Sequence, residues 1–143
     1  MPADVVPISD KLREAREEVL RRHLDAHTRG DVDAVVATYR TPRIEIIHSG
    51  RVLEGADAVR SYLLERRRAF PDQRFEVICV HHSDRVVVVE HWMSGTHAGE
   101  LHGVEPSGKR FRARVASIFE FDGEDLVNQR VYYDAGAVAR QLA

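Results

Sequence analysis

The chain has 143 residues, of which 43% are hydrophobic and 31% charged, and its formal net charge is -2. This length and balance predict one folded domain over residues 1–143, with residues 1–9 as a loose tail. The near-neutral charge excludes a global positive field for nucleic acid or an anionic membrane, so we expect a small-molecule partner. A single cysteine, Cys79, excludes an internal disulfide, and no apolar run suits a signal peptide or membrane span, so a cytoplasmic protein is expected.

The N-terminal part of the chain shows the periodicity of two helices. Residues 10–29 carry apolar side chains at helical spacing, with Ser9 available as N-cap and Gly30 as terminator. A second helix is predicted after Asp31, ending at Pro42. These two helices should pack as a hairpin.

A strand and a third helix follow. Residues 43–49 alternate so that Ile44, Ile46 and His48 share one face of a first strand. Residues 57–70 then predict a helix with its own apolar stripe.

The main basic cluster of the chain lies within this third helix. It consists of Arg60, Arg66, Arg67 and Arg68. Because other residues of the helix supply its apolar stripe, we interpret the cluster as a solvated face.

The rest of the chain is predicted to form strands, apart from a short final helix. The expected strands are residues 74–82, 85–97, 109–121 and 126–134, and the helix is 135–142. Helices first and antiparallel strands later indicate an α+β fold, with helices over one face of a bent antiparallel or mixed sheet. Such a sheet encloses a tapered cavity suited to a ligand, and its other face is left for a second subunit.

Several segments together form a pattern that resembles one known family. These segments are Gly30–Asp33, Gly55–Arg60, Trp92–Glu100, Gly103–Lys109, Val131–Asp134 and Arg140–Leu142. The pattern is similar to that of SnoaL-like polyketide cyclases, within the NTF2-like, ketosteroid isomerase-like superfamily. The resemblance implies an α+β cone, usually a homodimer, and an intramolecular aldol ring closure that needs neither metal nor organic cofactor.

Asp134 is the first candidate for catalysis. It closes the last predicted strand, on the same face as Tyr132, and an aspartate at this place resembles the acid/base of the cyclases. A carboxylate in a partly apolar pocket has a raised pKa, which makes it a stronger base. An equally open alternative is that Asp134 caps the final helix.

Histidines supply the other candidates. His48 ends the first strand, where related isomerases carry a carboxylate base, and a neutral imidazole there could shuttle protons; the alternative is a surface histidine. His97 resembles a position that orients substrate or acid in the cyclases, and His102 follows in the next loop. The eight histidines show no tight ligand spacing, so no metal site is predicted. We interpret His91, like the adjacent pair at 81–82, as an ordinary strand residue.

Aromatic residues complete the predicted site. Trp92, Tyr132 and Tyr39 are candidates for stacking on a planar polycyclic ligand. No nucleotide fingerprint or phosphate loop occurs, so no cofactor is expected. The leading hypothesis is a cofactor-free cyclase acting on a polyketide or similar polycyclic carbonyl compound. The alternatives are a dehydratase, isomerase or epoxide hydrolase of the same fold, and a binding protein without catalysis.

Overall fold

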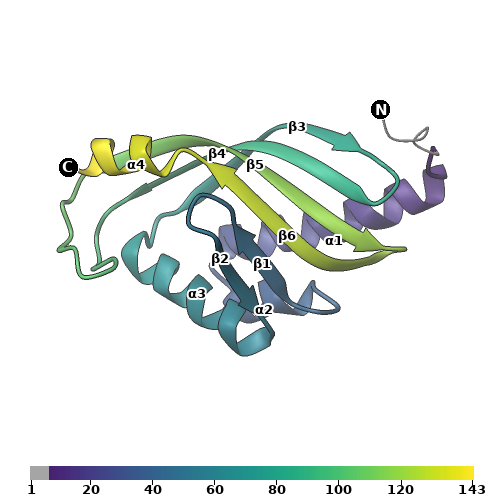
Figure 1. Cartoon of the computed structure of the whole chain (residues 1–143), viewed down its shortest axis with the longest axis horizontal. Helices are drawn as coiled ribbons and strands as arrows, with labels where there is room; N and C mark the ends of the chain where they lie inside the picture. The colour runs from purple at the N-terminus through teal and green to yellow at the C-terminus, as the bar shows by residue number, and fades with distance from the viewer. Residues whose placement is uncertain (1–6) are drawn as a thin grey trace.

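A computed structural model describes residues 7–143 of the chain, which form four helices and six strands (Figure 1). The helices are α1 (Asp10–Arg29), α2 (Val32–Ala37), α3 (Ala56–Ala69) and α4 (Ala135–Leu142). The strands are β1 (Arg43–Ile46), β2 (Arg51–Glu54), β3 (Arg74–His82), β4 (Val86–Thr96), β5 (Arg110–Asp122) and β6 (Asp125–Tyr133). No helix in this part of the chain is both long and apolar enough to cross a membrane.

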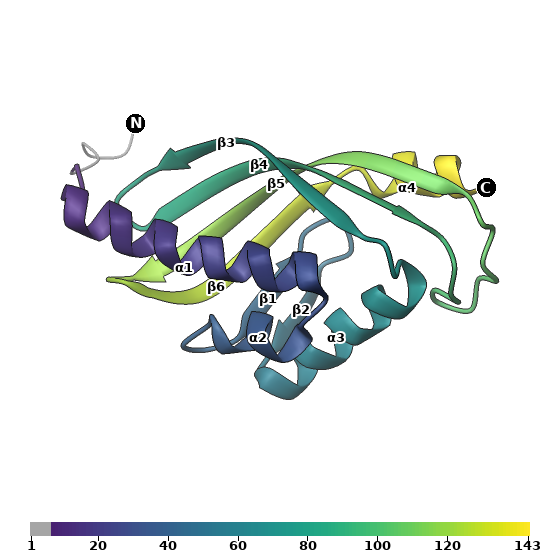
Figure 2. The same ribbon diagram turned by 180° about the vertical axis from the view of Figure 1, so that it is seen from behind.

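All six strands belong to one mixed sheet in the order β2-β1-β6-β5-β4-β3. Neighbouring strands are antiparallel except β1 and β6, which pair in parallel. Register shifts at Val77/Cys79 in β3 and Glu120/Phe121 in β5 mark irregularities of the kind that bend a strand. The sheet curls, and α1 crosses its concave face while α2 and α3 close the same side (Figure 2). The structure therefore confirms the predicted α+β cone.

The ends of α1 follow the sequence signals. The Ser9 hydroxyl accepts a hydrogen bond from the Leu12 N–H at 3.1 Å. Gly30 ends the helix with φ of 69°, and its N–H bonds to the carbonyls of Ala26 and His27. Ser9, the last residue of the predicted loose tail, is the N-cap that the sequence offered for this helix. Residues 1–6 of that tail lie outside the described residues.

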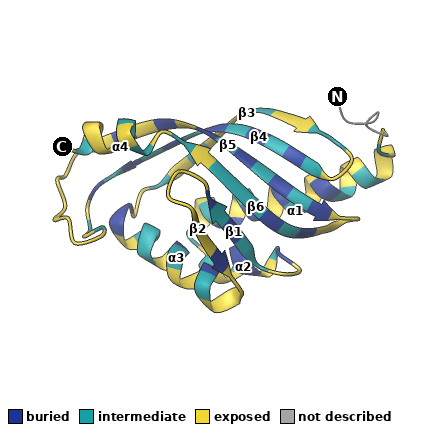
Figure 3. Ribbon diagram, viewed as in Figure 1, coloured by how far each residue is buried: buried dark blue, intermediate teal, exposed yellow. Residues whose placement is uncertain are grey.

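The core lies between the concave face of the sheet and the helices. Residues of β4 and β5 alternate between buried and less buried classes, which Figure 3 shows as dark bands along these strands. Val87, Val89 and Phe119 point to the concave side and pack with Val35 of α2 and Val59 of α3. The alternation fixes which strand residues face the helices.

Two predicted elements, the second helix and the first strand, were too long. The second helix ends at Ala37, well before Pro42, because Tyr39 already bridges to Leu126 of β6 and joins the sheet. The first strand ends at Ile46, so His48 lies in the following turn and not on the strand face. In both cases a tertiary pairing or a turn overrides the local pattern.

Candidate functional site

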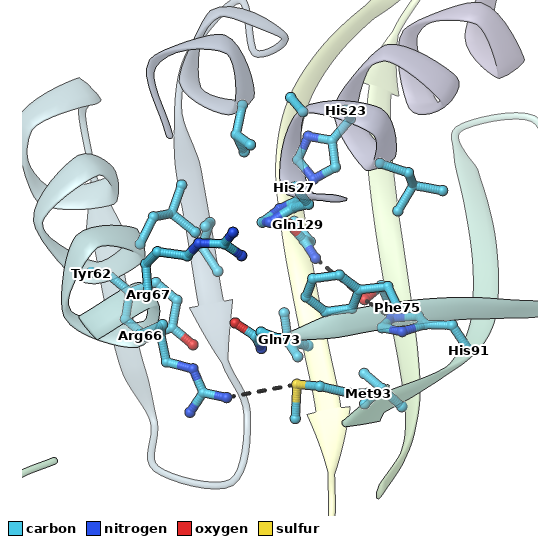
Figure 4. Close-up of a pocket in the computed structure, with 18 of the residues that line it drawn as sticks. His23, His27, Tyr62, Arg66, Arg67, Gln73, Phe75, His91, Met93 and Gln129 are labelled. Atoms are coloured by element: carbon cyan, nitrogen blue, oxygen red, sulfur yellow. Dashed lines mark hydrogen bonds between the residues drawn. The ribbon is translucent and has the colours of Figure 1, made fainter. Parts of the chain in front are cut away.

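A cavity of about 90 Å³ lies between α1, α3 and the concave face of the sheet (Figure 4). Most of its wall is apolar, with Val35 and Leu63 on the helices and Ile44, Val115 and Phe119 on the sheet. A few polar side chains interrupt this wall, which is the usual character of a small-molecule site.

Three histidines line the cavity: His23 and His27 on α1, and His91 on β4. The spacing of four residues puts the first two on one face of the helix, and their ring centroids are 4.8 Å apart. Burial lowers the pKa of His23 well below its ordinary value and also lowers that of His91. At neutral pH these two imidazoles are uncharged.

Hydrogen bonds fix the tautomer of His23. Its Nδ1 lies 2.8 Å from the Thr38 hydroxyl oxygen, and this hydroxyl donates its proton to the Val35 carbonyl at 2.7 Å. The hydroxyl oxygen must therefore accept from His23, which places the imidazole proton on Nδ1. The Nε2 atom of His23 then carries a lone pair.

A chain of hydrogen bonds holds His91. The Tyr39 hydroxyl donates to Gln129 Oε1 at 2.7 Å, and Gln129 Nε2 donates to the Ser117 hydroxyl oxygen at 3.2 Å. Ser117 lies 3.1 Å from His91 Nε2, while His91 Nδ1 lies 3.4 Å from the Trp92 carbonyl. Since a carbonyl only accepts, His91 carries its proton on Nδ1 and accepts from Ser117 at Nε2. Both ring nitrogens of His91 are thus engaged.

His27 differs from the other two histidines. Its ring packs edge-on against His23 and, at 5.0 Å, against Phe75. Among the described residues its ring nitrogens have no hydrogen-bond partner. Burial, with His91 and Arg67 nearby, lowers the pKa of His27 to about 4. His27 therefore presents a neutral imidazole whose nitrogens are available to a ligand.

Helix α3 contributes the polar groups of the opposite wall. Figure 4 shows Tyr62, Arg66 and Arg67 entering the cavity from this helix. Burial raises the pKa of Tyr62, so its hydroxyl keeps its proton at neutral pH. The guanidinium of Arg66 lies 5.0 Å from the centre of the Phe70 ring and 3.7 Å from Met93 Sδ.

Arg67 depends on the glycine that ends α1. A Cβ atom at Gly30 would lie 2.4 Å from Arg67 Nη2, so a larger residue there would displace the guanidinium. The prediction of a solvated basic face was thus wrong for Arg66 and Arg67. It was right for Arg60, which pairs with the exposed Asp33, and for the exposed Arg68.

Asp134 lies outside this cavity. Its Oδ1 accepts a hydrogen bond from the Ala137 N–H at 2.9 Å, which makes it the N-cap of α4, and its side chain is 71% exposed. Asp134 and Tyr132 do share an open groove with His48, as alternation suggested for the first two, but the groove lies on the convex face. The expected enclosed pocket around Asp134 is therefore not what the structure shows.

The other convex-face candidates are held by neighbours. His48 is exposed and packs edge-on against Tyr133 at 4.8 Å. Trp92 is covered by the guanidinium groups of Arg112 and Arg114, which lie 3.7 and 4.5 Å from its ring centre. These residues do not meet the cavity histidines.

The remaining predicted site residues are dispersed. His97 is buried but does not line the cavity: its ring centroid lies 5.7 Å from that of Phe70, and its Nδ1 accepts from the Ser107 N–H at 3.2 Å. His102 lies in an exposed loop, 3.3 Å from Glu65 Oε1. Tyr39 is buried beside the cavity and acts there through its bond to Gln129, not as an exposed stacking platform. Within residues 7–143, no three His, Cys, Asp or Glu side chains converge as metal ligands.

A sequence signal for the actual cavity was present. His23 and His27 lie on the apolar stripe of α1, and His91 alternates with the buried Val89 and Met93 of β4. Histidines on two buried faces that pack together are candidates for one site. The interpretation of His91 as an ordinary strand residue missed this convergence.

Comparisons with known proteins identify relatives of this chain in family and fold. The profile of the family described as SnoaL-like polyketide cyclase matches residues 17–142, whereas no curated protein matches the chain.

Three solved structures are similar to it in fold. A candidate polyketide cyclase from Xanthomonas campestris pv. campestris has a TM-score of 0.83 and 17% identity, over 92% of this chain and 99% of that one. A candidate hydroxylase from Streptomyces galilaeus has a TM-score of 0.77 and 20% identity, over 90% and 81% of the two chains. A protein with a ketosteroid isomerase-like fold from Catenulispora acidiphila, in complex with trimethylamine, has a TM-score of 0.75 and 14% identity, over 87% and 91%. The profile match covers nearly the whole length, and so the chain belongs to the SnoaL-like polyketide cyclase family.

Proposed function

We propose that the cavity is a cofactor-free acid–base site for a small carbonyl compound, with His27 as the group that moves the proton. The observation that carries the proposal is the neutral imidazole of His27, which faces the cavity with both ring nitrogens unengaged among the described residues. His23 and His91 have at least one nitrogen committed to the protein. The aldol-type ring closure implied by the family is the leading reaction.

In this reaction the imidazole of His27 accepts a proton from carbon next to a carbonyl, and an enolate forms. The enolate carbon attacks a second carbonyl of the same molecule, forming a carbon–carbon bond and an alkoxide. The imidazolium then returns its proton to the alkoxide, so no net proton or electron is gained. The lowered pKa keeps the imidazole neutral at physiological pH, so it is free to accept the proton, although it is a weaker base than an ordinary histidine. Its conjugate acid is correspondingly a stronger proton donor to the alkoxide in the last step.

Tyr62 is the proposed hydrogen-bond donor to the enolate oxygen. Its hydroxyl lies in the wall opposite the sheet, and burial keeps it protonated. A donor aimed at developing negative charge stabilises a transition state most strongly where water is excluded. The mostly apolar walls of this cavity favour such a donor.

The size of the cavity favours a small substrate. Pockets for drug-sized ligands are commonly about 300–1,000 Å³, whereas this one is about 90 Å³. We therefore propose a monocyclic or acyclic carbonyl compound in place of the polycyclic ligand expected from the family resemblance. A larger ligand would require the arginine side chains of α3 to move.

Exchange of α-hydrogens for deuterium in acetophenone, followed by NMR, tests the proton-transfer step without knowledge of the natural substrate. The protein should accelerate the exchange, and His27→Gln should lower the acceleration by about 100-fold to 10,000-fold. His102→Gln, in an exposed loop, is the matched control and should leave it unchanged. Binding of acetophenone without exchange would support the alternative of a binding protein, and equal exchange by both variants would reject His27.

We also propose that a second copy of the chain covers the convex face of the sheet. Val86, Val88 and Ile118 are only half-buried on this face, and Val88 and Ile118 are cross-strand partners. Contiguous apolar surface of this kind is typical of subunit contacts. Light scattering should give twice the mass of the chain; a monomer at high concentration would contradict this.

A further inference from the structure

The charge of the cavity is unbalanced. Among residues 7–143 its lining includes two guanidinium groups, those of Arg66 and Arg67, and no carboxylate. Within this part of the chain neither Arg66 nor Arg67 forms an ion pair, and the nearby histidines are neutral. The partners of Arg66 are an aromatic ring and a thioether sulfur. Two positive charges thus face a mostly apolar space without a protein counter-charge.

Arginines at the surface nearby do form ion pairs, so the lack of a carboxylate is particular to the cavity. Arg60 and Arg51, at the outer surface around the same helix, pair with Asp33 and Glu65 at 2.9 and 3.9 Å. Glu65 directly precedes Arg66 in sequence, yet its carboxylate is turned to the outside, toward Arg51 and His102. Glu65, the acid next to the pair in sequence, is therefore not part of the cavity wall.

Such a site attracts anions. A charge in apolar surroundings interacts more strongly than one in water, and an uncompensated cation there favours a bound counter-ion. The guanidinium also offers a planar set of donors that matches the oxygens of a carboxylate or phosphate. Arg66 and Arg67 supply two such groups from one wall.

We propose that the ligand of this cavity carries an anionic oxygen group, a carboxylate or a phosphate, which Arg66 and Arg67 bind. The proposal rests on the cavity being the functional site and narrows its substrates to anionic carbonyl compounds. The anionic group would lie against α3, with the rest of the molecule extending toward His27 and the sheet (Figure 4). The guanidinium groups would then fix which carbon reaches the imidazole.

Calorimetric titration with matched monocyclic probes tests this directly. Benzoate and phenyl phosphate carry the two anionic groups, and benzamide is the neutral counterpart of benzoate. We expect at least one anion to bind about 10-fold or more tightly than benzamide, and the better anion identifies the group. Arg66→Met and Arg67→Met should each weaken the preferred anion by about 10-fold and leave benzamide within about twofold.

Arg68→Met is the matched control, because Arg68 lies on the same helical turn and is exposed. It should change neither affinity, and circular dichroism should show all variants folded. Arg66→Lys and Arg67→Lys keep the charge, so partial retention of anion binding is expected if a methionine variant loses stability.

Equal binding of anions and benzamide by the unchanged protein, or no binding of either, would overturn the proposal. So would arginine variants that lose deuterium exchange but keep anion binding, since the guanidiniums would then serve the enolate. The His27→Gln variant separates this proposal from the catalytic one. It should retain arginine-dependent anion binding whether or not the exchange reaction is real.

Discussion

The two faces of the sheet carry similar residue types in different surroundings. On the concave face, His23, His27 and His91 are enclosed, and burial lowers the pKa of each. On the convex face, His48 and Asp134 are exposed beside an open groove. Residue type alone therefore does not identify the site, because removal from water is what changes the chemistry of an imidazole or carboxylate.

The largest change in the free energy of unfolding is expected from substitutions in β5, where adjacent residues lie on opposite faces of the sheet. Phe119 is buried on the concave side, 5.3 Å from the His23 ring, and Ile118 is half-buried on the convex side. Phe119→Ala should lower the free energy of unfolding by about 3–5 kcal/mol, and Ile118→Ala by about 1–2 kcal/mol, in urea denaturation. A loss for Ile118→Ala that shrinks on dilution, as the subunits separate, would reveal a second subunit on the convex face.

The second test removes the central hydroxyl of the hydrogen-bond chain. Ser117→Ala leaves His91 Nε2 without its donor and Gln129 Nε2 without its acceptor. An unsatisfied buried polar group costs about 1–3 kcal/mol, so thermal unfolding should show a loss of this size. Ser94→Ala, on the convex side of β4, should cost less than about 0.5 kcal/mol. Equal losses of stability in the two variants would show that water can replace the Ser117 hydroxyl in the hydrogen-bond chain.

The third test uses pH. An unfolded histidine has a pKa of about 6.5, whereas burial lowers that of His27 to about 4. Between these values the unfolded chain binds more protons than the folded protein, so stability is full above about pH 6.5 and is lost as pH falls toward 4.

Urea denaturation at pH 7 and pH 5 measures this loss. His27→Gln should reduce the difference between the two values by about 1–2 kcal/mol. His48→Gln replaces an exposed histidine and should leave the difference as it is. A loss that is unchanged in the His27 variant would mean that this imidazole is solvated.

The smallest effect is expected at Asp134. Asn also caps helices, so Asp134→Asn should preserve the bond to the Ala137 N–H and change stability by less than about 0.5 kcal/mol. Deuterium exchange should stay within about twofold of the unchanged protein. A decrease of about 100-fold in the exchange rate would place the catalytic group on the convex face and contradict the proposed site.

Local patterns predicted most of the fold. Strands β3 to β6 and helices α1, α3 and α4 lie within a few residues of their expected ranges, because alternation and capping signals are local. The site was harder to predict because it depends on which faces meet. Arg66 and Arg67 are polar residues of a helix with an apolar stripe, and only the packing of α3 near Gly30 shows that they turn inward.

The parallel pairing of β1 with β6 has a consequence for folding. Ile44 pairs with Gln129, so the strand that completes one wall of the cone comes from the far end of the described chain. Contacts between residues so distant in sequence close large loops and slow the search for the native topology. The helices and the β3–β4 hairpin have short-range contacts and are expected to form earlier. The ligand chamber should therefore be a late product of folding, absent from any intermediate in which β6 has not yet docked.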